Sequence, residues 1–106
     1  MPSETFYSLV SNGLLFDGAM GTMLIQAGLT GGQASESWIL ERPEEIANVH
    51  EAYAGAGAEV MTTCTFGGNR LKLEAAGLGQ QVADLNRRAT ELARSAAGSS
   101  RFVAGN

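Results

Sequence analysis

Residues 42–68, RPEEIANVHEAYAGAGAEVMTTCTFGG, contain the pattern that decides the fold of this chain. Pro43 suits the first position of a helix, and the two glutamates after it meet the positive end of the helix dipole. Apolar side chains then recur at helical spacing as far as Gly55 and Gly57, which end the helix. Residues 58–66 follow as an apolar, β-branched segment that turns polar, which is typical of a buried strand.

The same alternation of strands and helices extends to both sides of this stretch. Residues 13–18, GLLFDG, form an apolar run bounded by glycines and are predicted to be a strand buried on both faces. Residues 101–106, RFVAGN, are predicted to open a third strand. Helices are predicted over four further segments, which are 4–10, 21–29, 68–77 and 80–97. Because strands separated by helices of this length pair in parallel through right-handed crossovers, we expect an α/β fold.

The composition is that of an ordinary globular protein, and it argues against several classes of partner. Of the 106 residues, 44% are apolar and 17% are charged, and we expect one domain. The net charge of −4 argues against nucleic-acid binding, and the arginines between 87 and 94 alternate with acids, as on a solvated helix face. No apolar run reaches the roughly 18 residues of a membrane span, and no secretory leader pattern is present. The single cysteine, Cys64, excludes an internal disulfide, and we expect a cytoplasmic location.

Polar residues follow two of the predicted strands, at the edge of the sheet where parallel α/β folds carry their sites. Asp17, Gly18 and Ala19 end the first strand, and a run of threonines ends the second. Strand alternation places the Thr63 and Thr65 side chains on one face. An aspartate can pair with an ammonium group, while backbone amides and hydroxyls can bond a carboxylate. The sequence therefore predicts a site for the amino-acid end of a ligand.

Other readings of these motifs stay open on sequence alone. An Asp-Gly pair after a strand is often only a turn, and threonines are common in strands. The segment 18–22, GAMGT, could form a phosphate nest, but it lacks the Walker lysine and the GxGxxG spacing, and Asp17 would repel phosphate.

Four conspicuous side chains are interpreted as structural. His50 lies in the middle of the predicted helix with Ala54, which is no metal ligand, at i+4. Trp38 and Tyr53 are interpreted as packing residues. Cys64 has no neighbouring base in the sequence that would activate it as a nucleophile.

Three segments together resemble the start of the homocysteine S-methyltransferase family. They are DGAMGTML at 17–24, RPEEIANVHEAYAGAGAEVMTTCTFGGNRLKL at 42–73 and FVAGN at 102–106. The strongest likeness is to the homocysteine-binding module that begins cobalamin-dependent methionine synthases. The resemblance covers nearly the whole chain from Leu14 onward.

This resemblance implies a TIM (β/α)8 barrel in which a zinc ion binds the sulfur of homocysteine as a thiolate. In methionine synthases of this type the methyl donor is methylcobalamin, carried by another module. The resemblance assigns the amino-acid end of homocysteine to Asp17, Gly18 and Ala19, with Thr63 and Thr65 beside them.

Two departures from the family qualify this reading. Cys64 stands where the family often has asparagine. The family's zinc-binding cysteines come later in the barrel, so we expect residues 1–106 to be its N-terminal three-strand portion, without the metal-binding half and inactive alone. The expected partners are the remainder of the barrel or other methionine synthase modules. The alternatives are a non-catalytic α/β binding or assembly module, completed by a partner chain or by self-association, and a nucleotide-binding fragment.

Overall fold

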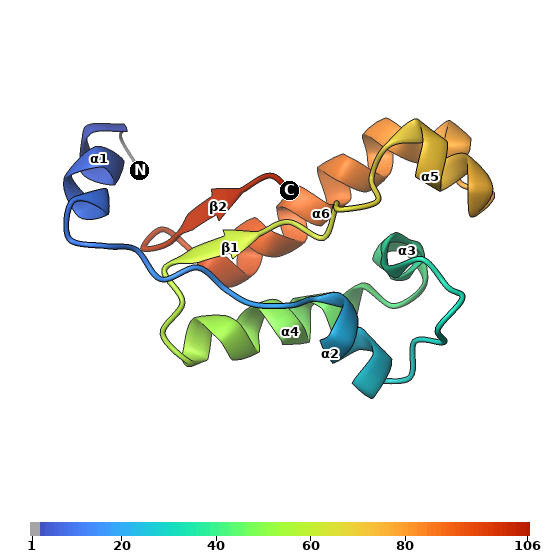
Figure 1. Ribbon diagram of the computed structural model, residues 1–106, viewed down its shortest axis with the longest axis horizontal. Helices are drawn as coiled ribbons and strands as arrows, with labels where there is room; N and C mark the ends of the chain where they lie inside the picture. The colour runs from blue at the N-terminus through green and yellow to red at the C-terminus, as the bar shows by residue number, and fades with distance from the viewer. Residues whose placement is uncertain (1–2) are drawn as a thin grey trace.

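The computed structural model describes residues 3–106, in which two short parallel strands are flanked by helices (Figure 1). The α-helices are α1 (Ser3–Val10), α2 (Gly21–Gln26), α3 (Trp38–Glu41), α4 (Pro43–Gly55), α5 (Arg70–Ala75) and α6 (Val82–Ala97). Two 3-10 helices, η1 (Ser35–Ser37) and η2 (Gly79–Gln81), precede α3 and α6. The strands are β1 (Val60–Thr62) and β2 (Phe102–Ala104).

The strands β1 and β2 pair in parallel, as the sequence predicts. The register places Val60 opposite Phe102 and Thr62 opposite Ala104. Helix α6 makes the crossover between them and is the longest helix of the described range. Parallel pairing needs such a crossover because the second strand must start at the same end of the sheet as the first.

The prediction of a short strand buried on both faces over residues 13–18 is wrong about the burial, and the strand is reduced to a single bridge. Only Phe16 forms a bridge there, parallel to Val60, although the Asp17 N–H also donates to the Val60 carbonyl at 3.0 Å. The Leu15 and Phe16 residues are 57% and 49% exposed. A buried parallel strand needs cover on both faces, and nothing in residues 3–106 covers these two side chains. The segment therefore runs beside β1 without becoming a third strand.

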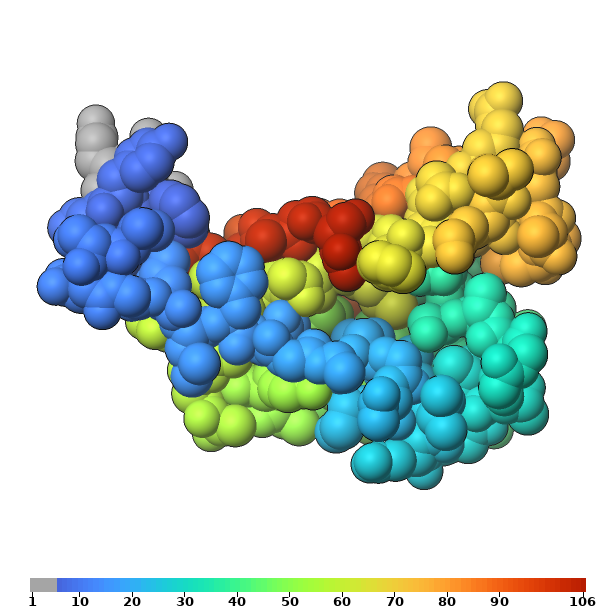
Figure 2. Space-filling view, in the orientation of Figure 1, coloured from blue at the N-terminus to red at the C-terminus, as the bar shows by residue number. Residues whose placement is uncertain are grey.

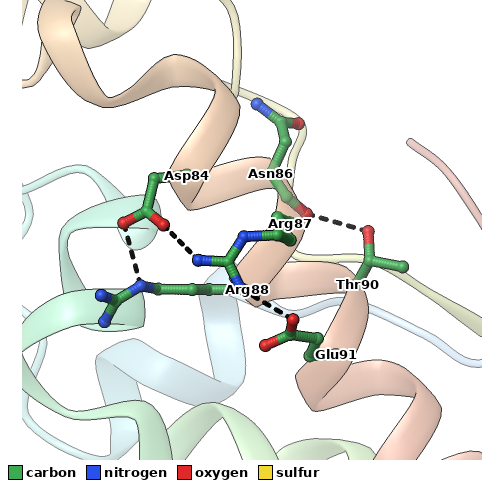
Figure 3. Close-up of polar contacts among 6 residues, drawn as sticks. All are labelled: Asp84, Asn86, Arg87, Arg88, Thr90 and Glu91. Atoms are coloured by element: carbon green, nitrogen blue, oxygen red, sulfur yellow. Dashed lines mark hydrogen bonds and ion pairs between the residues drawn. The ribbon is translucent and has the colours of Figure 1, made fainter.

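The helix predictions are confirmed with small changes at the ends. Helix α4 begins at Pro43, and Gly57 follows its end with a φ of +105°, a left-handed conformation that favours glycine. On α6 the Leu85 and Ala89 side chains are buried. The opposite face carries the predicted charge pattern, in which Arg87 bonds both Asp84 and Glu91 (Figure 3). These exposed ion pairs add little to stability.

The core lies between α4, α6 and the strands. One cluster joins Ile46 of α4 and Leu85 of α6 with Trp38, which is 4% exposed, so the interpretation of Trp38 as a packing residue is confirmed. A second cluster surrounds Met61 of β1 and includes Ala93 of α6. None of the helices within residues 3–106 has both the length and the apolar character needed to cross a membrane.

An arginine ties the end of α4 to the start of β2. The Arg101 guanidinium donates from Nε to the Ala58 carbonyl at 3.0 Å and from Nη2 to the Ala54 carbonyl at 3.1 Å. The Ala54 carbonyl also accepts the Gly57 N–H at 3.1 Å, so Arg101 adds a second donor at the end of α4 and binds the Ala58 carbonyl in the loop after it. No sequence pattern predicts this link.

Candidate functional site

A cavity of about 680 Å³ opens beyond the carboxyl end of β1. Its wall is formed by residues 18–21, 31–36 and 62–67, together with Lys72, Ala75, Ala76 and Asn106. The space-filling view shows the face on which the segments around 20, 35 and 66 come together (Figure 2). The volume lies in the range of small-molecule sites, and the position is the edge of the sheet that the sequence pattern indicates.

Four of the five predicted site residues line this cavity, and the fifth does not. Gly18, Ala19, Thr63 and Thr65 line it, whereas Asp17 is not part of its wall. The Asp17 carboxylate accepts two hydrogen bonds from Thr62, from the backbone N–H at 3.0 Å and from the hydroxyl at 2.8 Å. Sequence reasoning missed Thr62, because which of the successive threonines meets Asp17 depends on the register between residues 15–17 and β1.

The backbone at Gly18 and Ala19 is held by a side chain of α4. The Tyr53 hydroxyl donates to the Ala19 carbonyl at 2.8 Å. A Cβ on Gly18 would lie only 2.9 Å from the Tyr53 hydroxyl oxygen. Tyr53 is thus the packing residue that the sequence indicates, and it also fixes this loop. The glycine is required for the approach of the tyrosine ring.

The threonine hydroxyls at the cavity wall bond to each other. The Thr63 and Thr65 hydroxyl oxygens are 2.6 Å apart, and Thr65 donates to the Asn106 carbonyl at 3.3 Å. Either threonine can be the donor within the pair, so the pair uses one hydroxyl proton and leaves the other for Asn106 or for a ligand.

Glu36 is the functional candidate that sequence reasoning missed. It lies in η1 at the cavity wall and is only 6% exposed. Its Oε2 atom accepts the Gly67 N–H at 3.1 Å. No pattern in the sequence distinguishes this glutamate from the surface glutamates around it, since acidic residues are exposed in most proteins.

Burial favours the neutral form of two ionisable side chains near the site, Cys64 and His50. Burial, followed by the nearby charge of Glu36, raises the pKa of the Cys64 thiol to about 12. Cys64 is therefore no nucleophile at neutral pH, in agreement with the sequence interpretation. Burial lowers the pKa of His50, while the charge of Asp17 opposes the shift. His50 is a fully buried packing residue whose two ring nitrogens have no hydrogen-bond partner in residues 3–106.

The donor set of the described residues does not fit the zinc ion that the resemblance implies. No three His, Cys, Asp or Glu side chains within residues 3–106 lie close enough together to hold a metal ion. The nearest soft ligand to the cavity is Cys64, which burial keeps protonated, whereas zinc binds the thiolate.

Sequence comparisons match nearly the whole chain to one protein family. Residues 14–106 match the family described as homocysteine S-methyltransferase. Methionine synthase of Mycobacterium leprae (strain TN) is 34% identical over 98 residues, which are 87% of this chain and 8% of that protein. Methionine synthase of Mycobacterium tuberculosis (strain ATCC 25618 / H37Rv) is 36% identical over 84 residues, which are 74% of this chain and 7% of that protein. The chain thus spans less than a tenth of these relatives.

A structural comparison gives the same result. The fold matches the crystal structure of the metallated form of the homocysteine methyltransferase MmuM from Escherichia coli, with a TM-score of 0.79 and 33% identity. That match covers 92% of this chain and 39% of the methyltransferase chain. On both sequence and structure, this chain belongs to the homocysteine S-methyltransferase family.

Proposed function

We propose that this chain supplies the amino-acid-binding part of a homocysteine S-methyltransferase, an enzyme that forms methionine by methyl transfer to the homocysteine thiol. The observation that carries the proposal is the cavity beyond β1. Four of the five residues assigned to homocysteine by the family resemblance, Gly18, Ala19, Thr63 and Thr65, line its wall. Membership of the family supports the choice of homocysteine among amino acids.

Asp17 belongs to the proposed site as the fifth residue. Its two hydrogen bonds from Thr62 hold the carboxylate beside β1, next to the Gly18 and Ala19 backbone that lines the cavity. A direct contact between Asp17 and the substrate ammonium remains a prediction from the resemblance. Replacement of Asp17 by asparagine removes the charge and one of the two bonds from Thr62, so its effect on binding is compared with that of Thr62→Val, which removes such a bond and keeps the charge.

The rest of the proposed enzyme lies outside these residues. We propose that residues 1–106 are a partial homocysteine-binding domain, the N-terminal part of a TIM barrel, because the chain spans only 39% of the matched methyltransferase chain. The zinc ion and the methylcobalamin donor would then be held by other parts of the barrel or by other methionine synthase modules. The cytoplasmic location remains a prediction from the sequence.

One observation favours a second candidate, an assembly module. Several large apolar side chains are exposed, among them Phe16 at 49%, Phe66 at 76% and Leu71 at 82%. Surfaces of this kind commonly meet a partner. The same surfaces would be covered by the remainder of a barrel in the leading proposal, or by a second copy in the alternative.

Calorimetric titration of the 106-residue chain with L-homocysteine under reducing conditions tests the leading proposal. We expect saturable binding of one ligand, with changes in the amide resonances of Gly18 and Ala19. L-Alanine serves as a control that has the amino-acid end without the thiol side chain, and it should bind more weakly. The absence of saturable homocysteine binding would favour the assembly module. Methionine formation by the isolated chain would contradict the assignment of the metal and the donor to other residues.

A further inference from the structure

The loop after β1 carries two of the proposed substrate-binding residues and is largely buried. Thr63 and Thr65 are 4% and 8% exposed, and Gly67 is buried as well. The backbone turns tightly here, because the Thr65 N–H donates to the Thr63 carbonyl at 2.8 Å and the Gly68 N–H donates to the Thr65 carbonyl at 2.9 Å. Buried backbone groups of a loop need partners, since no helix or strand supplies them. The Gly67 N–H and the Gly68 carbonyl find theirs on other elements.

Glu36 of η1 bonds the loop from one side. The Gly67 N–H donates to its Oε2 atom at 3.1 Å, and the bond is buried. A Cβ on Gly67 would lie 2.7 Å from the Oε1 atom and 3.3 Å from the Cδ atom of Glu36, so any other residue at position 67 would displace the carboxylate. This bond needs an acceptor but no charge, because a glutamine oxygen can accept the same N–H.

Asn86 of α6 bonds the next residue of the loop. Its Nδ2 atom donates to the Gly68 carbonyl at 2.7 Å and to the Val82 carbonyl, one turn earlier on α6, also at 2.7 Å. The bond to Val82 fixes the amide against its own helix, so the bond to Gly68 holds the loop at a defined place. A Cβ on Gly68 would lie 2.9 Å from the Asn86 Oδ1 atom, so this approach also requires glycine.

Two separate elements therefore bond consecutive residues of the loop. Glu36 lies 31 residues before Gly67, and Asn86 lies 18 residues after Gly68. The threonine side chains of the same loop have weaker support, since their hydroxyls bond to each other and to the Asn106 carbonyl at 3.3 Å. The place of these hydroxyls at the cavity wall thus depends on the backbone that Glu36 and Asn86 hold.

We infer that Glu36 and Asn86 are positioning residues, which hold residues 63–68 in the conformation that binds the amino-acid substrate. This inference rests on the proposed function, which supplies the substrate, and it assigns to the two side chains bonds to the protein rather than to the ligand. Because the loop is ordered before the ligand arrives, binding does not have to order it. In a variant that loses one of these bonds, only the molecules with an ordered loop bind, and the apparent affinity falls by their fraction.

Calorimetric titration with L-homocysteine compares the wild-type chain with Glu36→Gln, Glu36→Leu and Asn86→Leu. Glutamine keeps an acceptor at position 36, whereas leucine removes the acceptor there and the donor at position 86. The control is Arg94→Met, which loses two bonds, to the Gly98 and Arg101 carbonyls at the other end of α6, and does not line the cavity. Affinities are compared under conditions in which tryptophan fluorescence shows every variant to be folded, so a loss of stability alone does not change them.

We expect Glu36→Leu and Asn86→Leu each to weaken homocysteine binding about tenfold, as for a loop that is ordered about a tenth of the time. Glu36→Gln should stay within about twofold of the wild type, because the acceptor is kept. Arg94→Met should not change the affinity. Weakening by Glu36→Gln as large as that by Glu36→Leu would overturn the inference, since the charge rather than the bond would then matter. Unchanged affinity in either leucine variant would overturn it as well.

Amide hydrogen exchange of the wild-type chain covers the case in which the leucine variants do not fold. The Gly67 and Gly68 N–H groups are both hydrogen-bonded, so they should exchange slowly in the free chain. We expect homocysteine to leave their protection unchanged relative to the amides of β1, because the loop is already ordered. Fast exchange in the free chain, with protection only after homocysteine is added, would overturn the inference. A wild-type chain that binds no homocysteine would instead refute the proposed function, whatever its exchange rates.

Discussion

The hydrogen bonds between Asp17 and Thr62 should stabilise the chain measurably, and replacement of Thr62 by valine tests this. The Thr62 hydroxyl donates to Asp17 at 2.8 Å, and valine removes that bond while keeping the shape of the side chain and the backbone bond of 3.0 Å. A hydrogen bond to a charged group contributes about 1.5–3 kcal/mol, and the low end applies because both residues are only partly buried. Asp17→Ala removes both bonds, so we expect a loss of about 3 kcal/mol.

Urea unfolding followed by the fluorescence of the single tryptophan, Trp38, measures these differences. With a slope of about 1.5 kcal/mol per molar urea, Thr62→Val should lower the unfolding midpoint by about 1 M and Asp17→Ala by about 2 M. Thr62→Ser is the matched control, since it keeps the hydroxyl and should lie nearer to the wild type. A Thr62→Val midpoint equal to that of the wild type would refute the reasoning that this bond holds residues 15–17 against β1.

Three further outcomes follow from the contacts of the site. Tyr53→Phe loses the bond to the Ala19 carbonyl, so the free energy of unfolding measured in urea should fall by about 1 kcal/mol. Restoring tyrosine at position 53 should restore the wild-type value. Cys64, with a pKa of about 12 and 4% exposure, should react with iodoacetamide at pH 8 far more slowly in the folded chain than in urea; equal rates would contradict its burial. Burial lowers the pKa of His50 in the folded chain below its usual 6.5. As the pH falls, the imidazole is therefore protonated in the unfolded chain before it is protonated in the folded chain, and the free energy of unfolding should decrease below about pH 6.5. The unfolding midpoint at pH 5.5 against 7.5 measures this, and His50→Asn, which removes the only histidine, should flatten the dependence.

The elements that the sequence predicts correctly are those whose signals are local. The proline and glycines that bound α4, the helical spacing of apolar residues and the glycine after α6 all act within a few residues of the chain. The parallel pairing of β1 and β2 follows from the length of the crossover helix. These features need no knowledge of distant parts of the molecule.

The features that the sequence did not predict depend on contacts between distant segments. Residues 13–18 have the composition of a buried strand, but burial also needs a covering layer, and Phe16 has none within residues 3–106. The partner of Asp17 is set by a register between segments 45 residues apart, and a shift of one residue would exchange Thr62 for Thr63. Glu36 resembles a surface acid until the fold places the loop containing Gly67 over it, 31 residues further along the chain.

The rotational setting of α4 is fixed from two directions by bonds to opposite ends of the chain. Tyr53 and Ala54 are neighbours on this helix, so their positions lie about 100° apart around its axis. Tyr53 reaches the Ala19 carbonyl near the start of the chain, while the Ala54 carbonyl accepts from Arg101 near its end. A rotation of α4 that kept one bond would break the other. Insertion of a single residue between Tyr53 and Ala54 would turn these two groups by about 100° relative to each other, so one of the two bonds would be lost even if every helix remained intact.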